Sequence, residues 1–141
     1  DLAILMQMLL NKGIYAGDRY LSEEVIAEFT KCQFCKPDGS GNRRGLGFDR
    51  PVNGKGGPTC ECVSYASFGH TGFTGTMAWA DPENQLVYIF LSNRVYPNAN
   101  KNLLAEMNIR TRIQEVVNDA VSARISATRV AAIELEDRNT R

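Results

Sequence analysis

Residues 64–93 read SYASFGHTGFTGTMAWADPENQLVYIFLSN, and this stretch decides the fold because it predicts three consecutive β-strands. These strands are expected over Ser64–Gly72, Thr74–Ala80 and Gln85–Asn93. Asp81 followed by Pro82 suits the first two positions of a type I turn, so the second and third strands form a hairpin. The continuous apolar run at 86–91 is typical of a strand that is covered on both faces. The stretch therefore predicts an antiparallel sheet that lies between other elements.

Helices are expected on both sides of these strands. Residues 2–10 are apolar on nearly every face of a helix, which is typical of a buried helix. Ser22 is placed to cap a second, shorter helix. After the strands, apolar residues at helical spacing predict a long amphipathic helix over Lys101–Ala123, and residues 124–141 either extend it or form an irregular tail. Helices around an antiparallel sheet define an α+β fold.

A loop-rich insert separates the first helices from the strands at residues 31–63. It is rich in Gly, Pro, Asn and Cys, and we expect a short strand within it at Arg44–Asp49. The insert contains all four cysteines of the chain, Cys32, Cys35, Cys60 and Cys62. Their C-x2-C and C-x-C spacing suits a structural zinc site poorly, because zinc ribbons usually space both pairs alike. Disulfides and free thiols are the alternatives, and the spacing does not choose among the three possible pairings.

Length and charge exclude several classes of protein. The 141 residues fit one modest domain, and the 16 basic residues balance the 16 acidic ones. A zero net charge removes the electrostatic argument for a nucleic-acid or anionic membrane partner, although Arg43, Arg44, Arg50 and Lys55 form a local basic cluster. No stretch reaches the ~20 apolar residues of a membrane span. The first residues lead straight into a helix and do not resemble a signal peptide, so we expect a segment of a longer chain.

Glycine and threonine surround the single histidine, His70, in the sequence FGHTGFTGT (68–76). Glycine in a strand often marks a close approach by a ligand or another backbone, so this segment could line a binding site. The alternative is a tight hairpin with a half-exposed histidine. The run from Gly69 to Gly72, with the Thr-Gly turn and two apolar strands after it, resembles the third motif of serine β-lactamase-like hydrolases. That family includes class C β-lactamases, D-Ala-D-Ala peptidases and esterases. The resemblance covers most of residues 1–121 and is strongest to Bacteroidetes-type members, some of them fused to a β-N-acetylglucosaminidase.

The resemblance implies both a fold and a site. Residues 1–123 would form the C-terminal part of a β-lactamase-like domain, with an incomplete antiparallel sheet flanked by helices. His70 would be the catalytic group that this segment supplies, and Thr71 and Gly72 would bind the substrate. The backbone N–H of Phe73 would help to form the oxyanion hole.

Other parts of the family's machinery are not found in this sequence. The family's nucleophile is a serine in Ser-x-x-Lys, but no serine here has lysine three residues later. Tyr96-Pro97-Asn98 matches the family's Tyr-x-Asn motif but follows the third motif, so we assign it no catalytic role. Asp49 and Asp81 are available for a Ser-His-Asp triad, but no Gly-x-Ser-x-Gly elbow occurs. We therefore expect the isolated chain to be inactive.

The resemblance also implies a substrate class and a location. The third motif has a histidine in place of lysine, which favours a peptidase or esterase over a β-lactamase. Val95, where a polar contact is expected, favours the same choice. We expect an amide or ester substrate, either a small molecule or peptidoglycan-like, in the periplasm or another extracytoplasmic space. Such a space favours disulfides over zinc. No cofactor is expected.

Two alternatives to an enzyme segment remain. The His-Thr-Gly strand could belong to a ligand-binding module without catalysis, or the chain could be a small structural module held by its cysteines. As an enzyme segment, it would lack the N-terminal part of its own domain. The resulting open strand edge predicts self-association.

Overall fold

The described residues form a three-stranded sheet, a small hairpin and four helices. The computed structural model describes residues 1–36, 42–52 and 57–139, with side chains up to residue 128. The elements in chain order are α1 (Leu2–Leu10), β1 (Ile14–Tyr15), β2 (Asp18–Arg19), α2 (Glu23–Thr30), β3 (Phe68–Thr71), β4 (Met77–Asp81), β5 (Leu86–Phe90), α3 (Leu103–Glu106) and α4 (Ile109–Asn139). The larger sheet is antiparallel with the strand order β3-β4-β5. The predicted α+β fold, with an antiparallel sheet flanked by helices, is confirmed.

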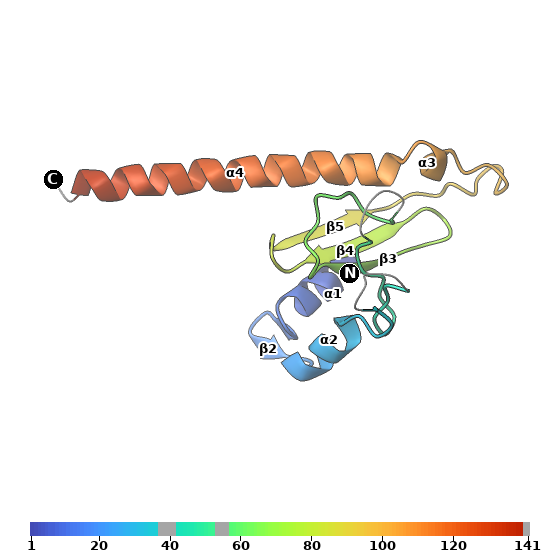
Figure 1. Ribbon diagram of the computed structural model, residues 1–141, viewed down its shortest axis with the longest axis horizontal. Coiled ribbons are helices and arrows are strands. Elements are labelled where there is room, and N and C mark those ends of the chain that lie inside the picture. The colour runs from blue at the N-terminus through green and yellow to red at the C-terminus, as the bar shows by residue number, and fades with distance from the viewer. Residues whose placement is uncertain (37–41, 53–56, 140–141) are drawn as a thin grey trace.

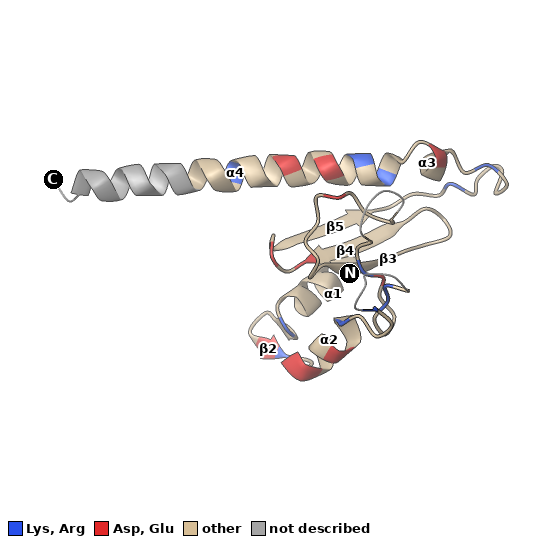
Figure 2. Cartoon of the chain, in the orientation of Figure 1, with Lys and Arg blue, Asp and Glu red and all other residues tan. Residues whose placement is uncertain are grey.

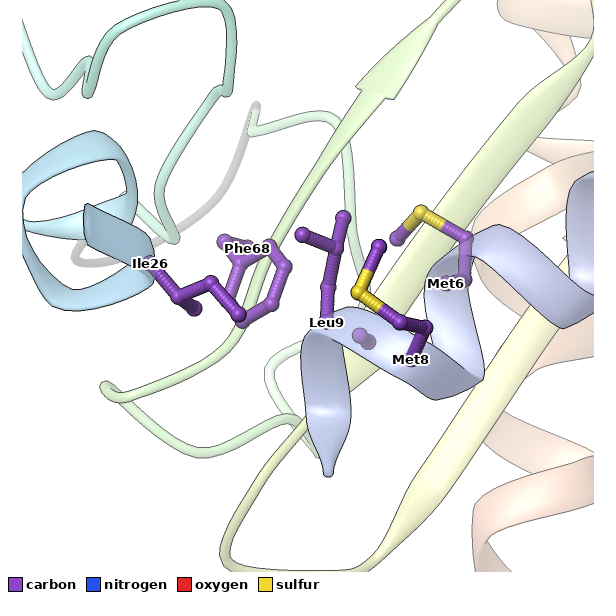
Figure 3. Close-up of a cluster of buried hydrophobic side chains, with 6 residues drawn as sticks. Met6, Met8, Leu9, Ile26 and Phe68 are labelled. Atoms are coloured by element: carbon purple, nitrogen blue, oxygen red, sulfur yellow. The ribbon is translucent and has the colours of Figure 1, made fainter. Parts of the chain in front are cut away.

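Helices lie on both faces of this sheet (Figure 1). On one face α1 and α2 contribute to a core that consists of Met6, Met8, Leu9, Ile26, Phe68 and Ala80 (Figure 3). On the opposite face, a second core consists of Met77, Trp79 and Tyr88. Val117 of α4 packs against this second core. The sheet is therefore the middle layer of three, and its two cores stabilise the fold by removing apolar surface from water.

The pairing register sends alternate side chains of β4 to the two cores. His70 pairs with Ala78, which packs against the first core, and Trp79 pairs with Tyr88 in the second core. Gly69 lies opposite Trp79, and a Cβ at this position would collide with the indole ring. Glycine at position 69 therefore makes room for the single tryptophan of the chain, whose indole N–H donates to the hydroxyl of Ser67 at 2.9 Å.

Two elements are less buried than the sequence predicts. The expectation that α1 is buried on nearly every face is wrong, because Leu2 and Leu5 are 42% and 48% exposed. The sheet covers only one side of this helix. The third strand does pack on both faces, with Val87 against the first core and Tyr88 in the second, but only Tyr88 is buried and Leu91 just beyond β5 is 72% exposed. The reason is that β5 is the edge of the sheet among the described strands.

Turns shift the boundaries of the predicted elements. β4 begins at Met77 rather than at the expected Thr74, because the N–H of Gly75 donates to the carbonyl of Gly72 at 2.9 Å and closes a turn. Gly75 takes a φ of 94°, a conformation that favours glycine. The expected helix over 101–123 is divided into α3 and α4 at Asn108, which has a φ of 52°. Of the two alternatives for residues 124–141, the described part shows the helix, since α4 continues to Asn139.

Candidate functional site

The segment before the strands folds back beside His70. The predicted short strand at Arg44–Asp49 is instead a tight turn, because its two end residues pair with each other in an isolated bridge and Gly47 takes a φ of 80° between them. The N–H of Asp49 then donates to the carbonyl of Gly69 at 2.7 Å, and the N–H of Gly69 donates back at 3.1 Å. These bonds place Asp49 at the edge of β3, and the bridge between Arg44 and Asp49 brings Arg44 there as well, next to the histidine.

His70 is half exposed and lies in a chain of polar contacts. Its Nε2 is 2.7 Å from Nη2 of Arg44 and 4.0 Å from Oδ2 of Asp49. Its Nδ1 is 2.8 Å from the carbonyl oxygen of Thr71. The Nε of Arg44 is in turn 2.9 Å from Oδ1 of Asp49. The sequence-predicted catalytic residue therefore has an arginine and a carboxylate as neighbours, and both come from the tight turn at 44–49.

Thr71, Gly72 and Phe73 lead from β3 into the turn. The N–H of Gly72 donates to the carbonyl of Thr76 at 2.8 Å, and a Cβ on Gly72 would collide with the Thr76 hydroxyl. The ring of Phe73 is 74% exposed and lies 4.5 Å from the guanidinium carbon of Arg94. Among the described residues, the N–H of Phe73 has no hydrogen-bond partner. This N–H is the donor that the sequence analysis assigns to an oxyanion hole.

An open pocket of about 260 Å³ begins at these three residues. Its lining consists of Thr71, Gly72, Phe73, Gly75, Arg94, Asn102 and Arg110. The two arginines bond to backbone carbonyls, Arg94 to Phe73 at 2.8 Å and Arg110 to Gly75 at 3.3 Å. Burial lowers the pKa of the Arg110 guanidinium, and the positive charge of Arg94 lowers it further. The pocket therefore combines polar donors with local positive charge, which suits a polar or anionic group.

The aspartates have different roles. Asp81 is buried, and its carboxylate accepts hydrogen bonds from the N–H and the hydroxyl of Ser64 and from the side chain of Asn84, so it holds a turn together. Asp49 lies near His70, but Arg44 takes its Oδ1. Within the described ranges, no serine hydroxyl forms a hydrogen bond with His70. The structure thus assembles no Ser-His-Asp triad in this part of the chain.

From the sequence, Arg44 is assigned to a basic cluster and to a short strand, and its contact with His70 is not predicted. A usable signal was present, because Arg44 and Asp49 carry opposite charges at the two ends of a Gly-Leu-Gly-Phe turn.

The described residues of the predicted basic cluster do not form one basic surface. Arg50 donates to the carbonyls of Thr30, Tyr65 and Ala66, and burial lowers the pKa of its guanidinium. Lys55 lies outside the described residues. Figure 2 shows basic residues beside β3 and also on α4, where acidic residues accompany them.

The cysteines form two local disulfides, Cys32–Cys35 and Cys60–Cys62. The disulfide interpretation is therefore confirmed. The N–H of Cys60 also donates to Oε1 of the buried Gln114 at 3.1 Å, so the second disulfide loop is attached to α4.

Among the described residues, no group of three or more His, Cys, Asp or Glu side chains is placed to hold a metal ion. In the same part of the chain, no helix has the length and hydropathy needed to cross a membrane.

Comparisons with known proteins point to one family. The family model described as Beta-lactamase matches residues 1–109. Curated proteins from Salmonella paratyphi B and Salmonella newport, both named putative D-alanyl-D-alanine carboxypeptidase, are 35% identical over 102 residues. The match covers 71% of this chain but only 22% of each relative's length. A crystal structure of a beta-lactamase from Mycobacterium bovis is similar with a TM-score of 0.62 at 24% identity, covering 83% of this chain and 42% of that one.

Proposed function

The chain belongs to the beta-lactamase family, and from this premise we propose that it forms the C-terminal part of a longer serine hydrolase that cleaves amide or ester bonds. The chain spans about a fifth of the length of the curated relatives it matches, 22%. It contains no Ser-x-x-Lys motif. Both facts support the proposal that the nucleophile comes from another part of the same protein.

The observation that carries the proposal is the backbone N–H of Phe73, which lies at a polar pocket and has no hydrogen-bond partner in the described part of the chain. A tetrahedral intermediate of acyl transfer develops negative charge on the former carbonyl oxygen. A backbone N–H with no partner among the described residues is a ready donor for that oxygen. Thr71, in the same pocket lining, supplies a hydroxyl for polar groups of the substrate. His70 precedes Thr71 in β3 but does not line this pocket, and its neighbours are Arg44 and Asp49.

The substrate class is proposed to be a cell-wall peptide or a related ester. The name of the Salmonella relatives, putative D-alanyl-D-alanine carboxypeptidase, supports a peptide with a free carboxylate. Local positive charge from Arg94 and Arg110 at the pocket is compatible with such an anion. Two disulfides support an extracytoplasmic location, because reducing compartments disfavour them.

The test uses the longest reading frame that contains this segment. We expect a Ser-x-x-Lys motif upstream, labelling of its serine by a fluorescent penicillin, and release of D-alanine from a D-alanyl-D-alanine peptide. The matched control replaces that serine with alanine, which abolishes labelling. The 141-residue chain by itself should neither be labelled nor hydrolyse a chromogenic cephalosporin or a nitrophenyl ester. Turnover by the isolated chain, or a reading frame without the motif, contradicts the proposal and favours a non-catalytic binding module.

A further inference from the structure

A continuous run of contacts links Asp49, Arg44, His70 and the backbone of Thr71. Asp49 contacts Nε of Arg44 at 2.9 Å, Arg44 contacts Nε2 of His70 at 2.7 Å, and Nδ1 of His70 contacts the Thr71 carbonyl at 2.8 Å. The distance from Asp49 to the imidazole itself is 4.0 Å, which is too long for a hydrogen bond. The hydrogen-bonded connection from the carboxylate to the histidine therefore runs through the arginine.

The chemistry of these groups assigns the protons on the imidazole. A backbone carbonyl can only accept, so Nδ1 of His70 carries the hydrogen. A guanidinium can only donate, so Nε2 offers its lone pair to Arg44. The contacts thus fit one species alone, the neutral imidazole with its hydrogen on Nδ1. The other neutral tautomer, or the doubly protonated ring, would point an N–H of His70 at an N–H of Arg44.

Exposure explains why such a hydrogen-bonded support is needed. The side chains of His70 and Arg44 are 51% and 42% exposed, so packing alone does not hold either of them. Asp49 is only 24% exposed, and its backbone is bonded in both directions to Gly69 of β3. Asp49 is therefore the least exposed of the three side chains and is bonded to β3, so its carboxylate fixes the arginine relative to the strand that carries the histidine.

We propose that Arg44, held by Asp49, is the positioning residue of His70 and fixes its imidazole in the neutral Nδ1–H tautomer. Two of the five N–H donors of Arg44 serve these two contacts, and among the described residues the other three remain for an acceptor group on a ligand. The catalytic consequence rests on the proposed function: in that reaction the imidazole acts as a neutral group, and the permanent cation beside it is Arg44. The tautomer itself does not depend on that function.

Nitrogen-15 NMR of the ¹⁵N-histidine-labelled chain tests the proposal, because His70 is the only histidine and its signals need no assignment. The unsubstituted chain should show Nδ1 protonated and Nε2 unprotonated. Arg44→Gln should shift the tautomer ratio about tenfold toward Nε2–H, since a charge-assisted hydrogen bond is lost. Arg44→Lys, which keeps a charged donor, should restore part of the ratio. Asp49→Asn should give a smaller shift in the same direction as Arg44→Gln.

The matched control is Arg43→Gln, since Arg43 is adjacent in sequence but contacts the carbonyl of Pro51 and the ring of Tyr65. It should leave the tautomer unchanged. A wild-type spectrum with Nε2 protonated, or equal shifts in the Arg43 and Arg44 variants, would overturn the proposal. In the longer hydrolase, Arg44→Gln should lower kcat and Arg44→Lys should recover part of it. If the longer protein has no activity while the NMR results hold, the proposed function fails and the positioning role of Arg44 stands.

Discussion

The phenol of Tyr88 donates a hydrogen bond to the backbone carbonyl of Arg110 at 3.1 Å, which joins the middle of β5 to the first turn of α4. Burial raises the pKa of Tyr88, and the charge of Arg110 opposes this only in part. The native state therefore holds the phenol proton more tightly than the unfolded state does. Among the described residues, this hydrogen bond, the one between Gln114 and Cys60 and the one between Arg110 and Gly75 connect α4 to the rest of the protein.

We predict that Tyr88 contributes to the alkaline unfolding of the protein. Because its folded pKa is raised, its contribution to stability is complete below the unfolded pKa of about 10 and falls as the pH rises through the folded pKa, by at most ~1.4 kcal/mol per pH unit. Tyr88→Phe should cost about 1 kcal/mol at pH 7 through the lost hydrogen bond. Urea unfolding at pH 7 measures the cost of the lost hydrogen bond. Urea unfolding above pH 10 measures the alkaline loss of stability. An alkaline loss of stability as large in the phenylalanine variant as in the wild type contradicts this role.

Asp81 is predicted to be a structural residue whose loss unfolds a turn. Its buried carboxylate accepts hydrogen bonds from Ser64 and from the backbone and side chain of Asn84, so Asp81→Ala leaves several donors unpaired. We expect a loss of about 2 to 4 kcal/mol in the free energy of unfolding. Asp81→Asn keeps one acceptor oxygen and the side-chain volume, and should cost less. Thermal and urea unfolding measure the change, and a loss below ~0.5 kcal/mol for the alanine variant would contradict this assignment.

The strands and helices could be predicted from the sequence because their signals are local. Apolar runs located the strands, and Ser22 caps α2 as predicted, accepting from the N–H of Val25 at 3.3 Å. What could not be predicted depends on contacts between distant segments. Whether α1 is buried depends on how many strands face it, and the contact from Arg44 to His70 crosses 26 residues. The periodicity of a segment carries no information about its neighbours across the fold.

His70→Ala is predicted to affect catalysis rather than folding. The side chain is half exposed and contributes no apolar packing to either core, so this chain should keep its melting temperature. In the longer hydrolase, turnover should fall by one to two decades, roughly 1.4 to 2.7 kcal/mol of transition-state stabilisation. The two measurements are thermal unfolding of the chain and steady-state kinetics of the longer protein. Unchanged kinetics together with a lower melting temperature would identify a structural histidine instead.

The disulfide pairing is predicted to be local, and peptide mapping tests it. Thiol titration of denatured, unreduced protein from an oxidising host should find fewer than four free thiols. Trypsin cleaves after Arg43 and Lys55, so Cys32 and Cys35 stay in one peptide and Cys60 and Cys62 in another. Each peptide should gain the mass of two hydrogens on reduction, and no disulfide-linked pair of peptides should occur. Linked peptides, or four free thiols with stoichiometric zinc, contradict the observed pairing.

The last prediction concerns the edge of the sheet at β5, which pairs only with β4 among the described strands. Unpaired strand edges are templates for association unless charges, proline or another segment protects them. Residues 86–90 contain no lysine or proline, and Leu91 next to them is 72% exposed. Val116 on α4 is 68% exposed, which adds a second apolar surface. We therefore expect the chain to dimerise or aggregate, or to recruit a complementary N-terminal segment.

Sedimentation velocity at micromolar concentration measures this association. Leu91→Lys should weaken it, because a lysine at the strand edge is costly to bury in a second sheet. The matched control is Leu103→Lys in α3, a residue with a similar exposure of 59% that lies outside the sheet, and it should leave the association unchanged. A cooperative, stable monomer of the wild-type chain would contradict the expected association and show that the β5 edge is stable without a partner. Equal weakening by both lysine variants would instead assign the association to general hydrophobicity, since only an edge-specific contact distinguishes Leu91 from Leu103.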